Sequence, residues 1–541
     1  MSSAALDSGM RGPGPHPLVR RRKLEDRALW TLTCLGVLAL ALFLATIVQN
    51  PNVALVILGV VGLTVLIALI VEPRLELTVG FLAIFLGCLD GPIKGFGGGG
   101  NATAVLQDVL IAAVCIGALA RLLSKHEPVR LPPMSGWVLT FVALVLVEAF
   151  NPNTLGLLKI LGGFRQQLEW TPFFFFGYAL IRSEGRLRTF FILLGVIASA
   201  NGVVSALEMQ ASPKQIASLG PGYAEHVEGA NGVSGTGFKA EGEAHVRPLA
   251  LGSDIGFGGG LGVIALPATL VLMATGAFRR KWIAPLLCAG ALVAVVTSLS
   301  RTSVLGAVIA LLAFAGFSLS TGRQVIRPLL SLLALLVIAA VVVTLLSSTG
   351  GASAFDRYSS ITPEKVGTTA PSYKEISIKQ IPNDIANDPF GFGLGVSGAA
   401  SGFGGHTTVK LEGHGFSSET EYNFLMNEVG LPGLVLWIGL TLTLIFMGLT
   451  RLTSVADLDV RLSLAALFAA ISALTLMGFE GAFMASQGSG PFFWFATGTI
   501  SYWMLGPGRL QGPAGAPRGP DAARASGDAQ PPPAGILAGA G

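Results

Sequence analysis

Long apolar runs separated by short polar segments dominate this chain. A helix needs about 20 apolar residues to cross ~30 Å of hydrocarbon. Runs near that length lie at 28–48, 53–71, 77–89, 104–123, 134–150, 171–182, 189–208, 256–275, 283–299, 302–319, 329–347, 431–450, 461–480 and 490–506. None alternates as strands do, and helices satisfy their own backbone polar groups inside lipid. The pattern predicts an all-α polytopic membrane protein with about 14 transmembrane helices.

Basic residues divide unevenly between the loops that these spans define. With the N-terminus in the cytoplasm, the inner loops hold Arg74, Arg121, Lys125, Arg130, Arg182, Arg186, Arg188, Arg279, Arg280, Lys281, Arg323, Arg327, Arg451 and Arg461. The short outer loops hold only Lys94, Lys159, Arg165 and Arg301. An excess of Lys and Arg marks the cytoplasmic side. Because the number of spans is even, we expect both termini in the cytoplasm.

The same layout divides the chain into five parts. These are a basic cytoplasmic N-terminus (1–27), a transmembrane domain with an outer segment at 209–255 (28–347), one large extracytoplasmic loop (348–430), a second transmembrane domain (431–506), and a Pro/Gly/Ala-rich cytoplasmic tail (507–541) that we expect to be disordered. The first apolar run is too long for a signal peptide and ends without an A-x-A site, so we expect it to be retained.

Composition agrees with this class. The chain is 52% hydrophobic and 12% charged, about half the charge of a soluble protein, and its mean hydropathy is +0.67. A net charge of +4, scattered along the chain, does not indicate a nucleic-acid partner. The four cysteines lie in apolar runs without a CxxC spacing, which favours buried free thiols. His406 and His414 lack further ligands, and the glycines of 256–262 do not form GxGxxG. We therefore expect no metal or cofactor.

Three arginines break the charge rule. Arg165 precedes the sixth predicted span, Arg247 lies before the eighth, and Arg301 occupies a tight outer turn. An arginine near hydrocarbon usually has a partner, so snorkelling to headgroups or a structural ion pair is one interpretation. Three guanidinium groups at one face also suit a shared site for phosphate oxygens. Two acids, Asp108 and Glu148, lie within or at the ends of spans and are either functional or paired between helices.

The segment that leaves the large loop carries a family resemblance. Residues 419–433 read ETEYNFLMNEVGLPG. They resemble the signature His-[Asn/Ser/Gln]-x9-Gly-x-x-Gly of the O-antigen ligase and O-antigen polymerase superfamily, at the same loop-to-helix junction. Asp108, Arg165 before an aromatic span, Ser300-Arg301, and NDPFGFG at 387–393 resemble further family motifs in the same order. The resemblance covers roughly residues 100–500.

This resemblance implies a bacterial glycosyltransferase of the cytoplasmic (inner) membrane. It would transfer or polymerise glycan from an undecaprenyl-diphosphate-linked donor at the outer face, onto a saccharide or lipid-linked acceptor, during cell-surface polysaccharide synthesis. Arg165, Arg247 and Arg301 would bind the donor diphosphate without a metal. Membrane lipids would surround the enzyme. The family histidine that marks ligases is replaced here by Glu419, which favours polymerase-like or other transfer over strict ligase activity.

The role of Glu419 has two interpretations. A carboxylate can act as a general base, with His414 as the other candidate. Alternatively, Glu419 stabilises the start of the helix that follows, because acids favour helix N-termini. At the level of the whole protein, a lipid-linked-glycan transporter or flippase is the rival, although the polar groups gather outside and no internal repeat is visible. A purely structural scaffold is the third possibility.

Overall fold

The computed structural model describes residues 62–97, 101–124, 131–154, 156–228, 237–240, 243–319, 334–335, 337–338, 341, 358, 373–398, 420–483 and 485–510. The first predicted span, nearly all of 329–347, the C-terminal tail after residue 510 and most of the large loop lie outside these residues. Two compact units divide the chain. One joins Met1–Arg74 to Ala112–His126, and the other joins Leu75–Ile111 to Glu127–Gly541.

The first unit contains a short apolar helix and the end of a longer one. Gly62–Val71 is the short helix, and the last part of α5 (Asn101–Ser124) packs with it. Gly117 brings α5 close to the backbone of Ile70, where any larger side chain would clash. The guanidinium of Arg121 donates a hydrogen bond to the carbonyl of Glu72. These contacts place Gly62–Val71 beside the part of α5 that belongs to this unit.

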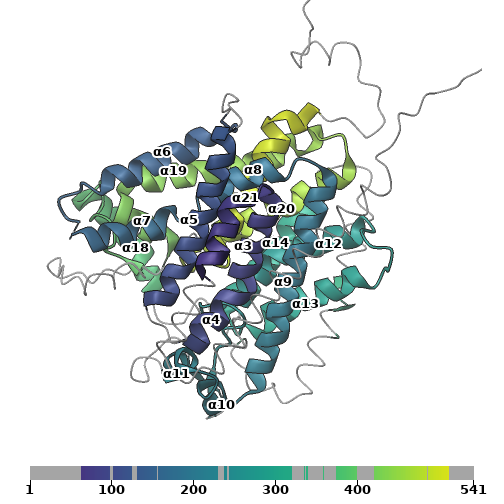
Figure 1. Cartoon of the computed structure of the whole chain (residues 1–541), viewed down its shortest axis with the longest axis horizontal. Helices are drawn as coiled ribbons and strands as arrows, with labels where there is room; N and C mark the ends of the chain where they lie inside the picture. Colours follow the sequence, from purple (N-terminus) through teal and green to yellow (C-terminus); the bar gives the residue numbers. More distant parts are fainter. Residues whose placement is uncertain are drawn as a thin grey trace, which may run out of the picture. The chain divides into compact units, whose positions relative to one another are not determined.

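The second unit contains the remaining described elements (Figure 1). They are α3 (Leu75–Ile84), η1 (Phe85–Leu89), α4 (Asp90–Gly97), the first part of α5, α6 (Ser135–Glu148), α7 (Leu157–Leu168), α8 (Pro172–Leu180), α9 (Glu184–Gln210), α10 (Pro213–Ala217), α11 (Pro221–Glu228), β1 (Gly237–Ala240), β2 (Glu243–Val246), α12 (Phe257–Ala274), α13 (Ile283–Thr297), α14 (Arg301–Leu319), α18 (Tyr373–Asn387), α19 (Glu421–Arg451), η6 (Leu452–Ser454), α20 (Leu458–Met477), α21 (Gly490–Leu505) and η7 (Pro507–Leu510).

Within the described residues, seven helices are long and apolar enough to cross a membrane. They are Leu75–Gly97, Val105–Ser124, Glu184–Gln210, Phe257–Ala274, Arg301–Leu319, Glu421–Ser454 and Leu458–Met477. The prediction of a helical membrane protein is therefore confirmed, whereas the number fourteen remains a prediction. The predicted sixth span, 171–182, is the nine-residue α8. At 1.5 Å per residue it extends only about 14 Å, too short to cross a bilayer alone.

Small residues bring the central helices together. α9, α12 and α13 pack against one another, and α12 also contacts α14 and α20. Gly202 of α9 lies against the backbone of α13, and Gly262 of α12 lies against Ala291. In the same way, Gly177 of α8 and Gly498 of α21 allow those two helices to touch through their backbones. Close backbone approach at small residues is the usual way that helices associate in lipid.

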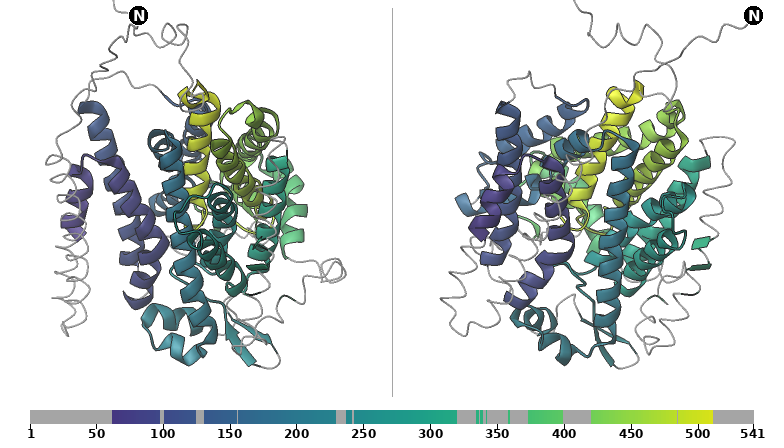
Figure 2. Two further views of the ribbon diagram at one scale, coloured as in Figure 1. Left: turned by 90° about the vertical axis from the view of Figure 1, so that its right-hand side faces the viewer. Right: turned by 45° about the vertical axis from the view of Figure 1, so that its right-hand side comes forward.

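A small cap lies at the far end of α4 and α9. α10, α11 and the hairpin β1–β2 gather there, opposite η7 (Figure 2). Ile216, Tyr223 and Leu249 form its apolar core. The hairpin is antiparallel, with Gly237 paired to Val246. It departs from the all-α prediction, because a two-stranded ribbon of four-residue strands is too short to give a visible alternation in the sequence.

The helix after the large loop begins earlier than predicted. α19 starts at Glu421, where Thr420 caps it by accepting a hydrogen bond from the Asn423 amide at 3.2 Å, whereas the predicted span starts at 431. Every residue of 421–430 is buried. Gly430 then breaks the helical geometry with φ 70° and ψ −170°, a conformation that essentially only glycine adopts. Hydropathy missed this first half because its polar groups are satisfied by other protein segments rather than by water.

Candidate anion site and apolar cavity

Arg247 and Arg301 lie close together at the start of α14. Arg247 is partly buried and follows β2, while Arg301 is the first residue of α14. Burial, followed by the positive charge of Arg301, lowers the pKa of Arg247. The Nε of Arg247 is a buried donor without a hydrogen-bond partner among the described residues. Two neighbouring cations at a helix N-terminus, itself the positive end of the helix dipole, favour the binding of an anion.

Both arginines stand beside strained turns. Leu299, two residues before Arg301, has φ 50°, and Ala250, three residues after Arg247, has φ 59°. Non-glycine residues adopt this left-handed conformation at a cost on the order of 1–3 kcal/mol. Such strain persists where the surrounding structure enforces it, and it gathers at functional sites. The two turns therefore fix the backbone that presents this pair, hereafter the arginine pair.

Residues of α9 and α11 hold the turn that follows Arg247. The Glu208 carboxylate accepts a hydrogen bond from the Ala250 amide at 2.8 Å, and the Asn201 side-chain oxygen accepts one from the Leu251 amide at 3.0 Å. The His226 ring nitrogen Nε2 lies 3.2 Å from the Arg247 carbonyl oxygen. Burial lowers the pKa of His226, which favours a neutral ring that donates one proton to this carbonyl. Sequence analysis missed Glu208 and Asn201, although polar side chains inside an apolar run are a usable signal.

Arg165 has different neighbours. Its Nε lies 3.0 Å from Oδ1 of Asp108 and 4.0 Å from Oε2 of Glu169. The three side chains, hereafter the acid–arginine cluster, come from α5, α7 and the turn after α7. Burial, and then the charge of Asp108, raise the pKa of Glu169 above its ordinary value. Arg165 thus faces acids, whereas the structure brings Arg247 and Arg301 together with each other.

A chain of polar side chains continues from the acid–arginine cluster. Gln107 donates to Glu169 at 2.5 Å and accepts from Lys94 Nζ at 3.2 Å. Lys94 pairs with Asp90 at 2.5 Å and also lies 3.5 Å from the Ser253 hydroxyl. Ser253 donates to Gln487 at 2.9 Å, and Gln487 donates to the Leu86 carbonyl at 2.9 Å. The chain therefore ends at Leu86 and Gln487, which both line a cavity.

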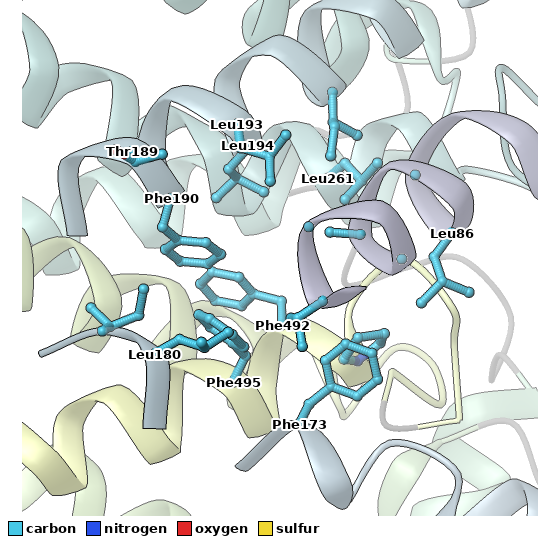
Figure 3. Close-up of a pocket in the computed structure, with 18 of the residues that line it drawn as sticks. Leu86, Phe173, Leu180, Thr189, Phe190, Leu193, Leu194, Leu261, Phe492 and Phe495 are labelled. Carbon is cyan, nitrogen blue, oxygen red and sulfur yellow. The ribbon is translucent and has the colours of Figure 1, made fainter. Parts of the chain in front are cut away.

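That cavity has a volume of about 240 Å³ and an almost entirely apolar wall. Side chains from α3, α8, α9, α12 and α21 line it, with the rings of Phe190, Phe492 and Phe495 packed together in the wall (Figure 3). On α9 the lining runs from Arg186 to Ile197, which is about 17 Å at 1.5 Å per residue. An elongated apolar space of this kind suits a hydrocarbon chain.

One end of the cavity lies near the turn that leads into Arg301. Phe257 and Gln487 line the cavity at the end where α12 and α21 begin. Gly256, the residue before Phe257, lies against Ser300, which immediately precedes Arg301. At the other end of the cavity, Glu76 and Arg186 form an ion pair at 2.5 Å. The turn that carries Arg301 therefore packs against the residue next to the Phe257 end of the cavity.

The motif at 387–393 packs on the buried half of α19. The Phe392 amide donates to the Asn427 carbonyl at 2.7 Å, and the Leu431 amide donates to the Pro389 carbonyl at 2.8 Å. Glu428, which is fully buried, accepts from Gln167 at 2.9 Å and from the Ser397 amide at 3.3 Å. These contacts anchor part of the large loop to helices that precede and follow it.

The predicted proton acceptors, Glu419 and His414, lie outside the described residues. The side chain that caps α19 belongs to Thr420, the residue after Glu419. Glu148 accepts from Asn151 at 2.9 Å, and Asn151 also donates to the Gly391 carbonyl at 3.2 Å. Glu148 is therefore bonded within the turn that ends α6, and neither a functional role nor pairing between helices, the two interpretations given to it, is shown. Glu169, Gln107, Lys94 and Gln487 were not singled out from the sequence, because only the fold reveals their contacts.

Neither a protein-family model, nor a curated protein, nor a solved structure matches this chain.

Proposed function

We propose that this chain is a membrane glycosyltransferase that transfers or polymerises glycan from a polyprenyl-diphosphate-linked donor. The observation that carries the proposal is the arginine pair, two cations that interact electrostatically beside strained turns, together with the apolar cavity whose end lies near the Arg301 turn. Guanidinium groups bind phosphate oxygens bidentately, and the cavity offers an apolar surface to the lipid chain of the same molecule. The resemblance to the O-antigen ligase and polymerase superfamily supports the same substrate.

The proposed reaction places negative charge where the arginines lie. The acceptor hydroxyl oxygen attacks the anomeric carbon, and the bond from that carbon to the diphosphate oxygen breaks. The electron pair leaves with the lipid diphosphate, and the hydroxyl proton passes to Glu419, with His414 as the alternative. Preorganised cations stabilise charge that develops on a leaving group, which removes the need for a metal at this step. The reaction would take place at the outer face of the cytoplasmic membrane.

A flippase or transporter for lipid-linked glycan is the second candidate. The observation in its favour is the polar group at each end of the apolar cavity, the Glu76–Arg186 ion pair at one end and Gln487 at the other. A lipid that moves along such a space would exchange polar contacts at its two ends. The two functions can be separated experimentally, because lipid transport requires two compartments, whereas glycan transfer does not.

A transfer assay in detergent therefore separates them. The purified protein is incubated with an undecaprenyl-diphosphate-linked oligosaccharide, and the products are separated by mass. We expect longer or transferred glycan together with released undecaprenyl diphosphate. Arg247→Lys and Arg301→Lys, which keep the charge but lose the planar fork, should lower the rate, whereas Arg280→Lys, at an exposed position in the α12–α13 loop, should not. A folded protein without product, but with glycan-lipid exchange in vesicles, would favour the flippase.

A further inference from the structure

The acid–arginine cluster contains more acid than base. Outside the cluster, Asp90 and Lys94 pair at 2.5 Å and neutralise each other. Within it, two carboxyl groups, Asp108 and Glu169, approach the same nitrogen atom of Arg165. Two carboxylates this close repel each other when both are ionised, which favours the retention of a proton by the pair.

We propose that Asp108 and Glu169 hold one proton between them. They are positioning residues: the charge of the pair determines how strongly Arg165 is held by the acids, and therefore how easily it can reach a bound diphosphate. With the proton present, the pair carries one negative charge, which Arg165 balances. When the proton leaves, two negative charges hold Arg165 and repel an anionic ligand. The consequence for the diphosphate rests on the proposed function, whereas the shared proton does not.

The groups around Glu169 support a single shared proton. Gln107 on α5 donates to one Glu169 oxygen at 2.5 Å, so the other oxygen is the one that faces Arg165. Asp108 is also on α5, and its own carboxylate is 36% exposed against 9% for Glu169. The less exposed carboxyl is the more favourable place for the proton, because burial disfavours its charged form.

The loop before α12 lies within electrostatic range of the cluster. Asp254, in the loop before α12, interacts electrostatically with both Arg165 and Lys94. This loop leads directly into Phe257 at the end of the cavity. Release of Arg165 from the acids would therefore add a cation beside the end of the cavity where we place the diphosphate.

The first test needs no ligand. Melting temperatures of the full chain in detergent are measured between pH 4.5 and 9 for the unchanged protein, Glu169→Gln, Asp108→Asn and the control Glu225→Gln, which removes an exposed carboxyl of α11. An acid with a raised folded-state pKa binds more protons when folded, so its contribution makes stability fall as pH rises from its ordinary value. We expect a shallower fall in Glu169→Gln than in the unchanged protein and Glu225→Gln. Equal slopes in all variants would overturn the shared proton.

The second test measures binding of farnesyl diphosphate by the same proteins. We expect the affinity of the unchanged protein to fall as pH rises, by up to about tenfold per pH unit more than the titration of the ligand itself explains. The control Glu225→Gln should show the same fall. Glu169→Gln, or Asp108→Asn if the first variant does not fold, should remove this additional pH dependence of the affinity. An additional pH dependence that persists in both variants would overturn the positioning role. If the unchanged protein binds no diphosphate at any pH, the proposed function fails, and the melting slopes alone decide the shared proton.

Discussion

The arginine pair and the acid–arginine cluster place arginine side chains in opposite electrostatic surroundings. In the pair, Arg247 is desolvated beside a second cation and stands next to a strained turn. In the cluster, Arg165 lies beside two carboxyl groups that are linked to a longer polar chain. A desolvated cation next to another cation lowers its free energy most by binding an anion, whereas a compensated one is already stabilised. The first setting therefore favours an anionic ligand, whereas in the second Arg165 would first have to leave its acids.

The largest expected effect tests on which side of the membrane the two arginine regions lie. Both regions lie where we predict the outer face, so single cysteines placed at two exposed positions should behave oppositely in cells after the native cysteines are replaced. Ser218→Cys, beside the cap, should react with an impermeant thiol reagent, and Arg280→Cys should not. Labelling at Arg280→Cys alone would place both arginine regions in the cytoplasm and end the proposed function.

The next effect concerns which region supplies the proton acceptor. If Glu419 is the base, Glu419→Gln should lower the transfer rate by ~10²–10⁴-fold at normal membrane abundance, since the side chain keeps its shape but cannot take the proton. Glu169→Gln should instead change the pH profile. Retained transfer in Glu419→Gln would leave that residue a helix-end charge worth about 0.3–1 kcal/mol and move the search to His414.

A double-mutant cycle sharpens the comparison itself. Removing one preorganised cation from a site of this kind costs ~10²–10³-fold in rate. Arg247→Gln and Arg301→Gln should be non-additive, with a coupling energy of about 0.5–3 kcal/mol, because neighbours in one site depend on each other. The effects of Arg165→Gln and Arg247→Gln on the transfer rate should be closer to additive. If the larger coupling joined Arg165 to Arg247, all three arginines would form one site from the start.

The smallest effect concerns the strained turn. Ala250→Gly relieves a left-handed backbone at a position with no long side chain to lose, so the unfolding free energy should stay equal or rise by up to about 1 kcal/mol. Transfer should fall if the strain helps to fix Arg247. A loss of stability comparable with Gly430→Ala, which forces alanine into a conformation suited to glycine, would show that Ala250 is held by favourable contacts instead.

Much of the helical layout followed from hydropathy alone. The predicted runs at 256–275, 461–480 and 490–506 coincide within a few residues with α12, α20 and α21. These helices lie in continuous apolar sequence. The free energy of transfer into lipid is favourable over the whole run, so the hydropathy pattern and the helix have the same bounds. α7 and the first half of α19 were missed, because their polar residues are paired within the protein, and hydropathy counts them as if they faced lipid.

The site was only partly predictable for a related reason. Charge asymmetry identified Arg165, Arg247 and Arg301 as unusual. It could not separate them into a pair and a cluster, since their partners lie far away in sequence: Asp108 for Arg165, and the α13–α14 turn for Arg247. The acids Glu169 and Glu208 gain their meaning only from those long-range contacts.

The break at Gly430 has a consequence for how the protein is made. The second half of α19, 431–451, is apolar enough to stop translocation by itself, whereas the first half carries Glu421 and Glu428, residues that a translocon admits at a cost of a few kcal/mol each near the bilayer centre. On the predicted topology, synthesis would therefore deliver the first half to the outer side as part of the loop. It would then fold back beside residues 388–398, which precede it in the chain and would already be translocated. The hinge would let one helix enter the membrane in two stages.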